Sequence, residues 1–202
     1  MLELRHIKKS YDHVTILEDI NLKIQDEEIV SILEPSGCGK TTLLNLVLGL
    51  TPADQGQILF DGKDITNVPM EERGFNIVFQ DYALFPNLNV YKNITYGLRN
   101  KPLSALDGVI KESIKEKIKE IARDFHLTTI IVTHDSEEAL TLSDKVLIVN
   151  QGHISQYGAP EEIITAPSNN FVKEFILNQL EIKRNNIFAL FHQNLTNSVQ
   201  AV

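Results

Sequence analysis

Residues 28–50 read EIVSILEPSGCGKTTLLNLVLGL and fall into three successive parts. Residues 29–33 are apolar and rich in β-branched side chains, which is typical of a strand buried on both faces. Residues 42–50 are apolar almost all round, which predicts a buried helix. Between them lies a turn rich in glycine, PSGCGKTT at residues 35–42.

A glycine-rich turn from a strand into a helix aims backbone N–H groups at one point, and the helix dipole adds partial positive charge there. Lys40 adds a full charge that can reach a phosphate, and the hydroxyl of Thr41 suits Mg²⁺. We therefore interpret residues 35–42 as a phosphate-binding segment, here named the phosphate loop. The alternative is a turn that only caps a helix and leaves Lys40 in solvent.

One position departs from the pattern G-x-x-x-x-G-K-[ST]. Its first glycine would fall at residue 34, where this chain has Glu34. Glycine gives the backbone a freedom that other residues lack, and a carboxylate beside phosphates repels them. We therefore expect Glu34 to weaken phosphate binding.

Length and charge limit the kind of protein that the chain forms. Its 202 residues suffice for one large domain, and a chain of this size buries about 70% of its unfolded surface. The net charge of −8 argues against a general nucleic-acid binder. The single cysteine, Cys38, lies in the phosphate loop, so a reducing compartment is expected. No segment has the apolar length of a membrane span.

Other elements are predicted from periodicity. Residues 2–7 and 16–24 alternate between apolar and polar side chains, which predicts antiparallel strands with one solvated face. Further strands are expected at 57–60, 75–79, 129–133, 145–150 and 153–157. Helices are expected at 107–125, 137–142, 160–165 and 170–180. Alternating strands and helices around a phosphate loop predict a parallel α/β core.

Five motifs in order make the chain resemble the ATP-binding subunit of ABC transporters, of the importer type, along residues 2–176. They are ILEDINLKI before the phosphate loop, QDYALFP from Gln80, LSALD from Leu103, VTHDSEEAL from Val132 and GAPEEIITAPSNNFV from Gly158. The resemblance implies the α/β fold of a P-loop NTPase core, a parallel sheet with flanking helices, plus an antiparallel β subdomain. It also implies a nucleotide-binding domain at 1–180, followed by a C-terminal helix and frayed tail at 181–202.

The resemblance implies a site for ATP and Mg²⁺. The expected phosphate-binding residues are Ser36, Gly37, Cys38, Gly39, Lys40, Thr41 and Thr42. Tyr11 matches the aromatic residue that stacks on adenine, and His134 matches the histidine at the γ-phosphate. Gln80 matches the glutamine that contacts Mg²⁺ and the attacking water, so Thr41 and Gln80 are the expected metal ligands. Without the family match these would be a turn tyrosine, a structural histidine and a polar strand end.

Two parts of the family pattern are missing from the sequence. No signature of the LSGGQ type occurs, so the helical subdomain that carries it is missing. The apolar Walker B strand that ends in Asp-Glu is missing as well, because Asn100 and Lys101 precede Pro102. We therefore expect an internal deletion near residues 99–102, which leaves a gap or a non-native replacement beside the strand at 29–33.

The implied function is that of an importer subunit which couples ATP binding and hydrolysis to solute uptake, and which the deletion leaves hydrolytically defective. Its expected partners are ATP, a membrane permease subunit and a second ATP-binding subunit, with no nucleic acid. The expected location is the cytoplasm, on the inner face of the cell membrane. One alternative is a non-catalytic remnant that binds nucleotide or a partner. Another is a small-molecule kinase, for which no acceptor site is visible.

Overall fold

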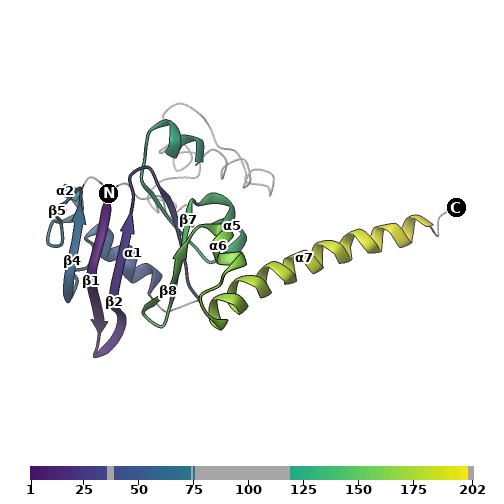
Figure 1. Ribbon diagram of the computed structural model, residues 1–202, viewed down its shortest axis with the longest axis horizontal. Helices are drawn as coiled ribbons and strands as arrows, with labels where there is room; N and C mark the ends of the chain where they lie inside the picture. Colours follow the sequence, from purple (N-terminus) through teal and green to yellow (C-terminus); the bar gives the residue numbers. More distant parts are fainter. Residues whose placement is uncertain (36–38, 74, 76–118, 200–202) are drawn as a thin grey trace, which may run out of the picture.

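The computed structural model describes residues 1–35, 39–73, 75 and 119–199 of the chain, and these contain two four-stranded sheets (Figure 1). The first sheet has the order β2-β1-β4-β5. Its strands are β1 (Leu2–Tyr11), β2 (Val14–Ile24), β4 (Gln55–Phe60) and β5 (Lys63–Asp64). All its pairings are antiparallel, and Leu4 lies between Leu22 of β2 and Ile58 of β4. The predicted antiparallel subdomain is confirmed.

The second sheet has the order β6-β3-β7-β8. Its strands are β3 (Ile29–Leu33), β6 (Thr129–Thr133), β7 (Lys145–Asn150) and β8 (His153–Gly158). β3 pairs in parallel with both β6 and β7, and β8 returns antiparallel to β7. The predicted parallel core is confirmed for β3 and β6. The strand expected at 75–79 lies outside the described residues, apart from Phe75.

The gap expected beside β3 is wrong. β3 is paired along both edges, and all five of its residues are buried. The second edge of β3 is occupied because β7 joins the parallel core. From the sequence, β7 was expected only in a hairpin with β8. The strand that is less well covered is β6. Its described pairing is with β3, and four of its five residues are partly exposed.

The helices lie in two layers around the second sheet. Helix α1 (Lys40–Leu48) packs between the two sheets, where Leu43 and Leu46 join a core built from both. Helices α5 (Ser136–Leu142), α6 (Pro160–Thr165) and the start of α7 (Asn170–Val199) cover the other face. Alternate residues of β7 point to opposite faces of the sheet. Leu147 packs in the core that contains α1, and Val146 packs in the core that contains α5, α6 and α7.

The end of α1 is closed by Arg73 of the short helix α2 (Met70–Arg73). The buried guanidinium donates four hydrogen bonds of 2.7–3.0 Å, to the carbonyl oxygens of Leu46, Val47, Thr66 and Val68. The last carbonyls of a helix lack partners within the helix, and they carry partial negative charge. Arg73 therefore satisfies the end of α1 and ties it to the segment that follows β5.

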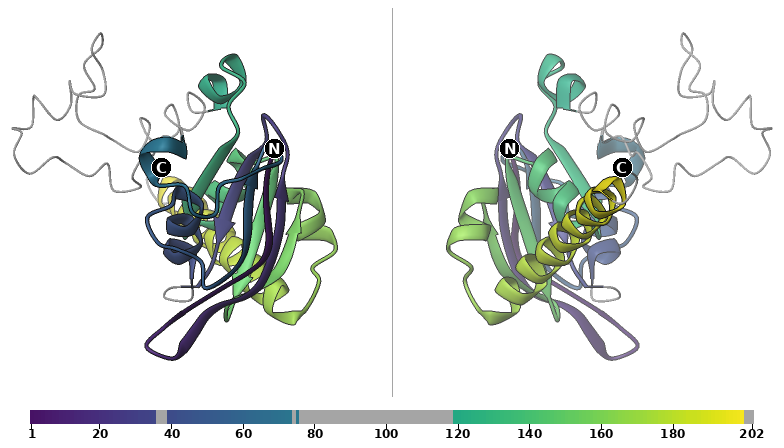
Figure 2. Two further views of the ribbon diagram at one scale, coloured as in Figure 1. Left: turned by 90° about the vertical axis from the view of Figure 1, so that its left-hand side faces the viewer. Right: turned by 90° about the vertical axis from the view of Figure 1, so that its right-hand side faces the viewer.

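Two helices differ from expectation. Helix α7 runs unbroken to Val199, where the sequence predicted a helix at 170–180 followed by a separate C-terminal helix and frayed tail, and it extends away from the sheets (Figures 1 and 2). Of the helix predicted at 107–125, residues 119–124 are described as helical. Its apolar face is uncovered there, with Ile121 43% and Phe125 70% exposed. Within the described ranges, no helix combines the length and the apolar character needed to cross a membrane.

Candidate functional site

The candidate site lies at the carboxyl edge of the parallel strands. Leu33, the last residue of β3, is paired with Thr133, the last residue of β6. Glu34 and His134 therefore leave the sheet at the same edge, and α1 begins nearby at Lys40. Ligands of α/β proteins bind at this kind of edge. The fold thus brings together two segments that are far apart in the sequence, as the sequence predicted.

Gly39 allows the phosphate loop to approach β2 closely. It is the N-cap of α1 with a φ of 140°, a conformation that side chains oppose. A Cβ at this position would lie 2.9 Å from Cδ2 of Leu17 and 3.4 Å from the carbonyl oxygen of Ile16. A residue other than glycine would thus push the loop away from β2.

Glu34 and Lys40 contact each other twice. The backbone N–H of Lys40 donates to Oε2 of Glu34, and the ammonium of Lys40 donates to the carbonyl oxygen of Glu34 at 2.9 Å. The Glu34 side chain is 1% exposed, and its Oε1 has no hydrogen-bond partner in the described part of the chain. Burial raises the pKa of Glu34, and the amide and ammonium of Lys40 oppose that rise.

The sequence missed this contact. It treated Glu34 only as a source of repulsion and of lost backbone freedom. The glutamate at the position where the pattern has glycine was the one signal for this contact. A pattern match cannot tell, however, in which direction that side chain points. The backbone of Glu34 is not among those with positive φ, so no left-handed strain arises there.

The backbone around His134 is fixed from both sides. Thr133 is buried at the end of β6, and Asp135 caps α5 by accepting hydrogen bonds from the N–H groups of Glu137 at 2.9 Å and Glu138 at 3.3 Å. A carboxylate at this position satisfies free amides and complements the helix dipole. The side chain of His134 is exposed at the edge of the sheet.

The remaining predicted residues lie at different places. Thr41 is exposed in the first turn of α1, and its hydroxyl is of the kind that can ligate Mg²⁺. Thr42 beside it is partly exposed. The described residues contain no group of three or more His, Cys, Asp or Glu that could hold a metal ion. The others, Ser36, Gly37, Cys38 and Gln80, lie outside the described residues.

Tyr11 lies in the first sheet, where it pairs with Val14 at the turn between β1 and β2. Its side chain is 42% exposed, and Nζ of Lys9 lies 5.1 Å from the centre of its ring. The Lys9 ammonium in turn donates to Asp54 at 2.8 Å. The ring is thus held by a cation–π contact while much of its surface remains accessible.

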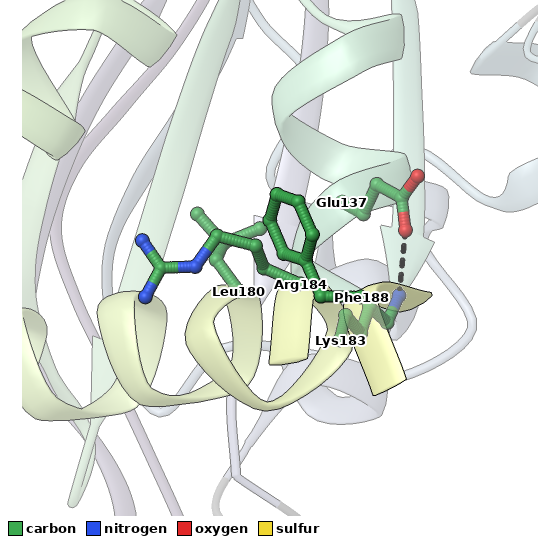
Figure 3. Close-up of a pocket in the computed structure, with 5 residues that line it drawn as sticks. All are labelled: Glu137, Leu180, Lys183, Arg184 and Phe188. Atoms are coloured by element: carbon green, nitrogen blue, oxygen red, sulfur yellow. Dashed lines mark hydrogen bonds and ion pairs between the residues drawn. The ribbon is translucent and has the colours of Figure 1, made fainter. Parts of the chain in front are cut away.

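A charged contact ties α7 to the capped end of α5. The ammonium of Lys183 lies 2.7 and 2.9 Å from the two carboxylate oxygens of Asp135 and 3.0 Å from Oε2 of Glu137. Figure 3 shows the Glu137–Lys183 pair beside a shallow depression between the helices. Its lining also includes Leu180, Arg184 and Phe188. Burial would raise the pKa of Asp135, but Lys183 and the amides of α5 outweigh it and lower that pKa.

Comparisons with known proteins agree with this geometry. Residues 17–149 match the family described as ABC transporter. The spermidine/putrescine import ATP-binding protein PotA of Haemophilus influenzae is 39% identical over 232 residues, which cover 87% of this chain and 62% of the relative. PotA of Mesoplasma florum is 36% identical, with 87% and 66% covered. The chain thus spans about three-fifths of the length of such relatives. The aligned region also exceeds the whole chain of 202 residues, so these relatives carry internal residues without a counterpart here.

Solved structures show the same fold. The dimeric structure of MJ0796, a bacterial ABC transporter cassette, superposes with a TM-score of 0.65 at 20% identity, covering 79% of this chain and 99% of that one. The structure of cbiO1 from Clostridium perfringens, part of the ABC transporter complex cbiONQ, gives 0.68 at 22% identity, with 95% and 98% covered.

Proposed function

The chain belongs to the ABC transporter family, and we propose that it is an ATP-binding subunit of an importer which holds nucleotide at the phosphate loop. The observation that carries this proposal is the start of α1 at the carboxyl edge of β3, with Lys40 in its first turn and His134 at the end of the paired strand. Free N–H groups, the helix dipole and an ammonium together attract phosphate.

Each site residue has a distinct proposed role. The backbone of residues 36–42 and the ammonium of Lys40 would hold the phosphates, and the exposed ring of Tyr11 would stack on adenine. Thr41, together with Gln80, would hold Mg²⁺, which neutralises phosphate charge when bound. His134 would contact the terminal phosphate from the end of β6.

The proposed partners are a membrane permease subunit and a second ATP-binding subunit. The likeness to a cassette whose structure is dimeric supports the second of these. The relatives named for spermidine and putrescine import make polyamines the first solutes to test. In this role the chain would act on the cytoplasmic face of the membrane, with the nucleotide-binding domain at residues 1–180 and the helix and tail at 181–202.

We further propose that an internal deletion leaves the chain defective in hydrolysis. The sequence lacks the signature and the Walker B carboxylates, and Asn100 and Lys101 precede Pro102 instead. The long alignment with PotA supports a loss of internal residues. The partly exposed strand β6 supports it too, because a parallel sheet normally buries both faces of its strands. A nucleotide-binding remnant without turnover is therefore the second candidate function.

Nucleotide binding is tested by titrating the purified full chain with fluorescent mant-ATP and Mg²⁺. We expect saturable binding that weakens by about tenfold or more in Lys40→Ala, because a charge-assisted contact to phosphate is lost. The control is Lys63→Ala, which removes an exposed ammonium from β5. Absence of saturable binding by both the natural chain and Glu34→Gly would contradict the proposal.

A further inference from the structure

The buried side chain of Glu34 points toward the start of α1. Its Oε2 accepts a hydrogen bond from the backbone N–H of Lys40, the first residue of the helix. Its Oε1 lies 3.5 Å from an ideal Cβ on Gly39, the N-cap residue. Both carboxylate oxygens therefore lie at the start of α1.

An N–H group in the first turn of a helix has no partner within the helix, and it is the kind of donor that binds phosphate oxygens. A carboxylate resembles a phosphate in charge and in its acceptor oxygens. At this helix start the carboxylate comes from the chain itself. The ammonium of Lys40 is engaged as well, because it donates to the carbonyl oxygen of Glu34 at 2.9 Å.

The second oxygen shows that this arrangement is incomplete. Oε1 of Glu34 is buried and has no hydrogen-bond partner in the described part of the chain, while the side chain as a whole is 1% exposed. A buried charged atom without a partner is costly. The contact of Oε2 with the Lys40 amide offsets this cost only in part, because the net effect is a raised pKa for Glu34.

We propose that the Glu34 carboxylate occupies the anion position at the start of α1, so that a nucleotide's phosphates bind there only after displacing it. This inference rests on the proposed function, because it takes the phosphate loop to be the nucleotide site. The loop is then self-inhibited by one side chain. The effect belongs to that side chain rather than to lost backbone freedom, because the backbone of Glu34 has no positive φ.

Three substitutions at residue 34 separate the two causes. Glu34→Gln removes the charge at equal size, Glu34→Ala removes the occupant and keeps a Cβ, and Glu34→Gly also frees the backbone. We expect the Kd for mant-ATP with Mg²⁺ to fall by about tenfold in Glu34→Gln and further in Glu34→Ala, since charge-assisted hydrogen bonds are roughly twice as strong as neutral ones. The control is Glu181→Gln, which changes the net charge equally at an exposed site on α7.

Tighter binding in Glu34→Gly alone would overturn the inference, because it would leave backbone freedom as the cause. Equal affinity in all forms would overturn it as well. A ligand-free measurement keeps the inference testable if no variant binds nucleotide, an outcome that would overturn the proposed function instead. The amide proton of Lys40 should move upfield in ¹⁵N–¹H spectra of Glu34→Gln and Glu34→Ala, because it loses a carboxylate acceptor. An unmoved Lys40 amide would show that the contact does not form.

Discussion

The ammonium of Lys183 lies 2.7 Å from Oδ1 of Asp135, so helix α7 is tied to the residue that directly follows His134. The same carboxylate caps α5 by accepting hydrogen bonds from two of its amides. One side chain therefore links the docking of α7 to the backbone that carries the candidate phosphate-contacting histidine. Any force that moves α7 relative to α5 acts on this carboxylate.

The first prediction concerns this link. Lys183→Ala should lower the free energy of unfolding by about 0.5 kcal/mol, because exposed ion pairs contribute little. Asp135→Ala should lower it by about 1 kcal/mol or more, because the helix cap is lost as well. Urea unfolding of both single variants and the double variant gives the coupling, and Lys173→Ala on the same helix is the control. A double variant whose loss equals the sum of the single losses would show that the pair contributes nothing.

The second prediction concerns the end of α1. Arg73→Ala removes four hydrogen bonds to carbonyl oxygens, of which, in the described part of the chain, only that of Leu46 keeps a donor, the N–H of Gly49. It should therefore destabilise the fold by on the order of 3 kcal/mol. Thermal and urea unfolding measure the loss. Arg123→Ala, at an exposed position, should change the stability by less than about 0.5 kcal/mol. Similar effects of the two substitutions would mean that Arg73 does not close the helix.

The third prediction concerns pH. Burial raises the pKa of Glu34 above its ordinary value of 4.5, against the opposing contact with Lys40. As the pH rises above 4.5, the unfolded chain therefore loses this proton before the folded chain does, and the folded state becomes less stable until the raised pKa is passed. Glu34→Gln removes that loss, so its advantage in urea unfolding should grow with pH across this window. An advantage that is constant from pH 4.5 to neutral pH would contradict the buried charge.

The fourth prediction concerns turnover. Purified chain with Mg²⁺ and ATP should release phosphate no faster than Lys40→Ala. Hydrolysis requires a positioned water and compensation of the charge that develops on the terminal phosphate. Lys101 stands where the water-polarising glutamate is expected, and the signature is missing from every copy of the chain. An intact ABC ATPase serves as the positive control. Phosphate release clearly above that of Lys40→Ala would contradict the prediction that the chain is defective in hydrolysis.

The sequence predicted the parts of the fold whose signal is local. The position of α1 was predicted from the apolar run at β3 and the glycine-rich turn that leads into an apolar helix. The edge of the sheet at which His134 lies was predicted from the apolar strand that precedes it. The predicted break near residue 180 does not occur, and residues 170–199 contain neither glycine nor proline that would stop the helix. The end of a helix depends on such stop signals more than on periodicity.

Other features lay beyond sequence reasoning because they depend on contacts between distant residues. A buried β-branched run indicates two neighbours for β3, but it does not tell which strands they are, so β7 was not expected there. The Lys183–Asp135 pair joins residues 48 positions apart, and no motif marks Lys183. The inward direction of Glu34 goes with its contact to the amide of Lys40, which no sequence pattern records.

The partly exposed strand β6 has a consequence for how the chain behaves at high concentration. Its apolar β-branched residues are only partly buried, and its described pairing is with β3. An apolar strand edge of this kind is a template for pairing with a strand of another molecule. Among the described residues no strand pairs with the other edge of β6, so we expect self-association through this edge to rise with concentration, and the net charge of −8 opposes it only through long-range repulsion. Such pairing would take place on the strand that ends directly before His134, so it would also affect the candidate site.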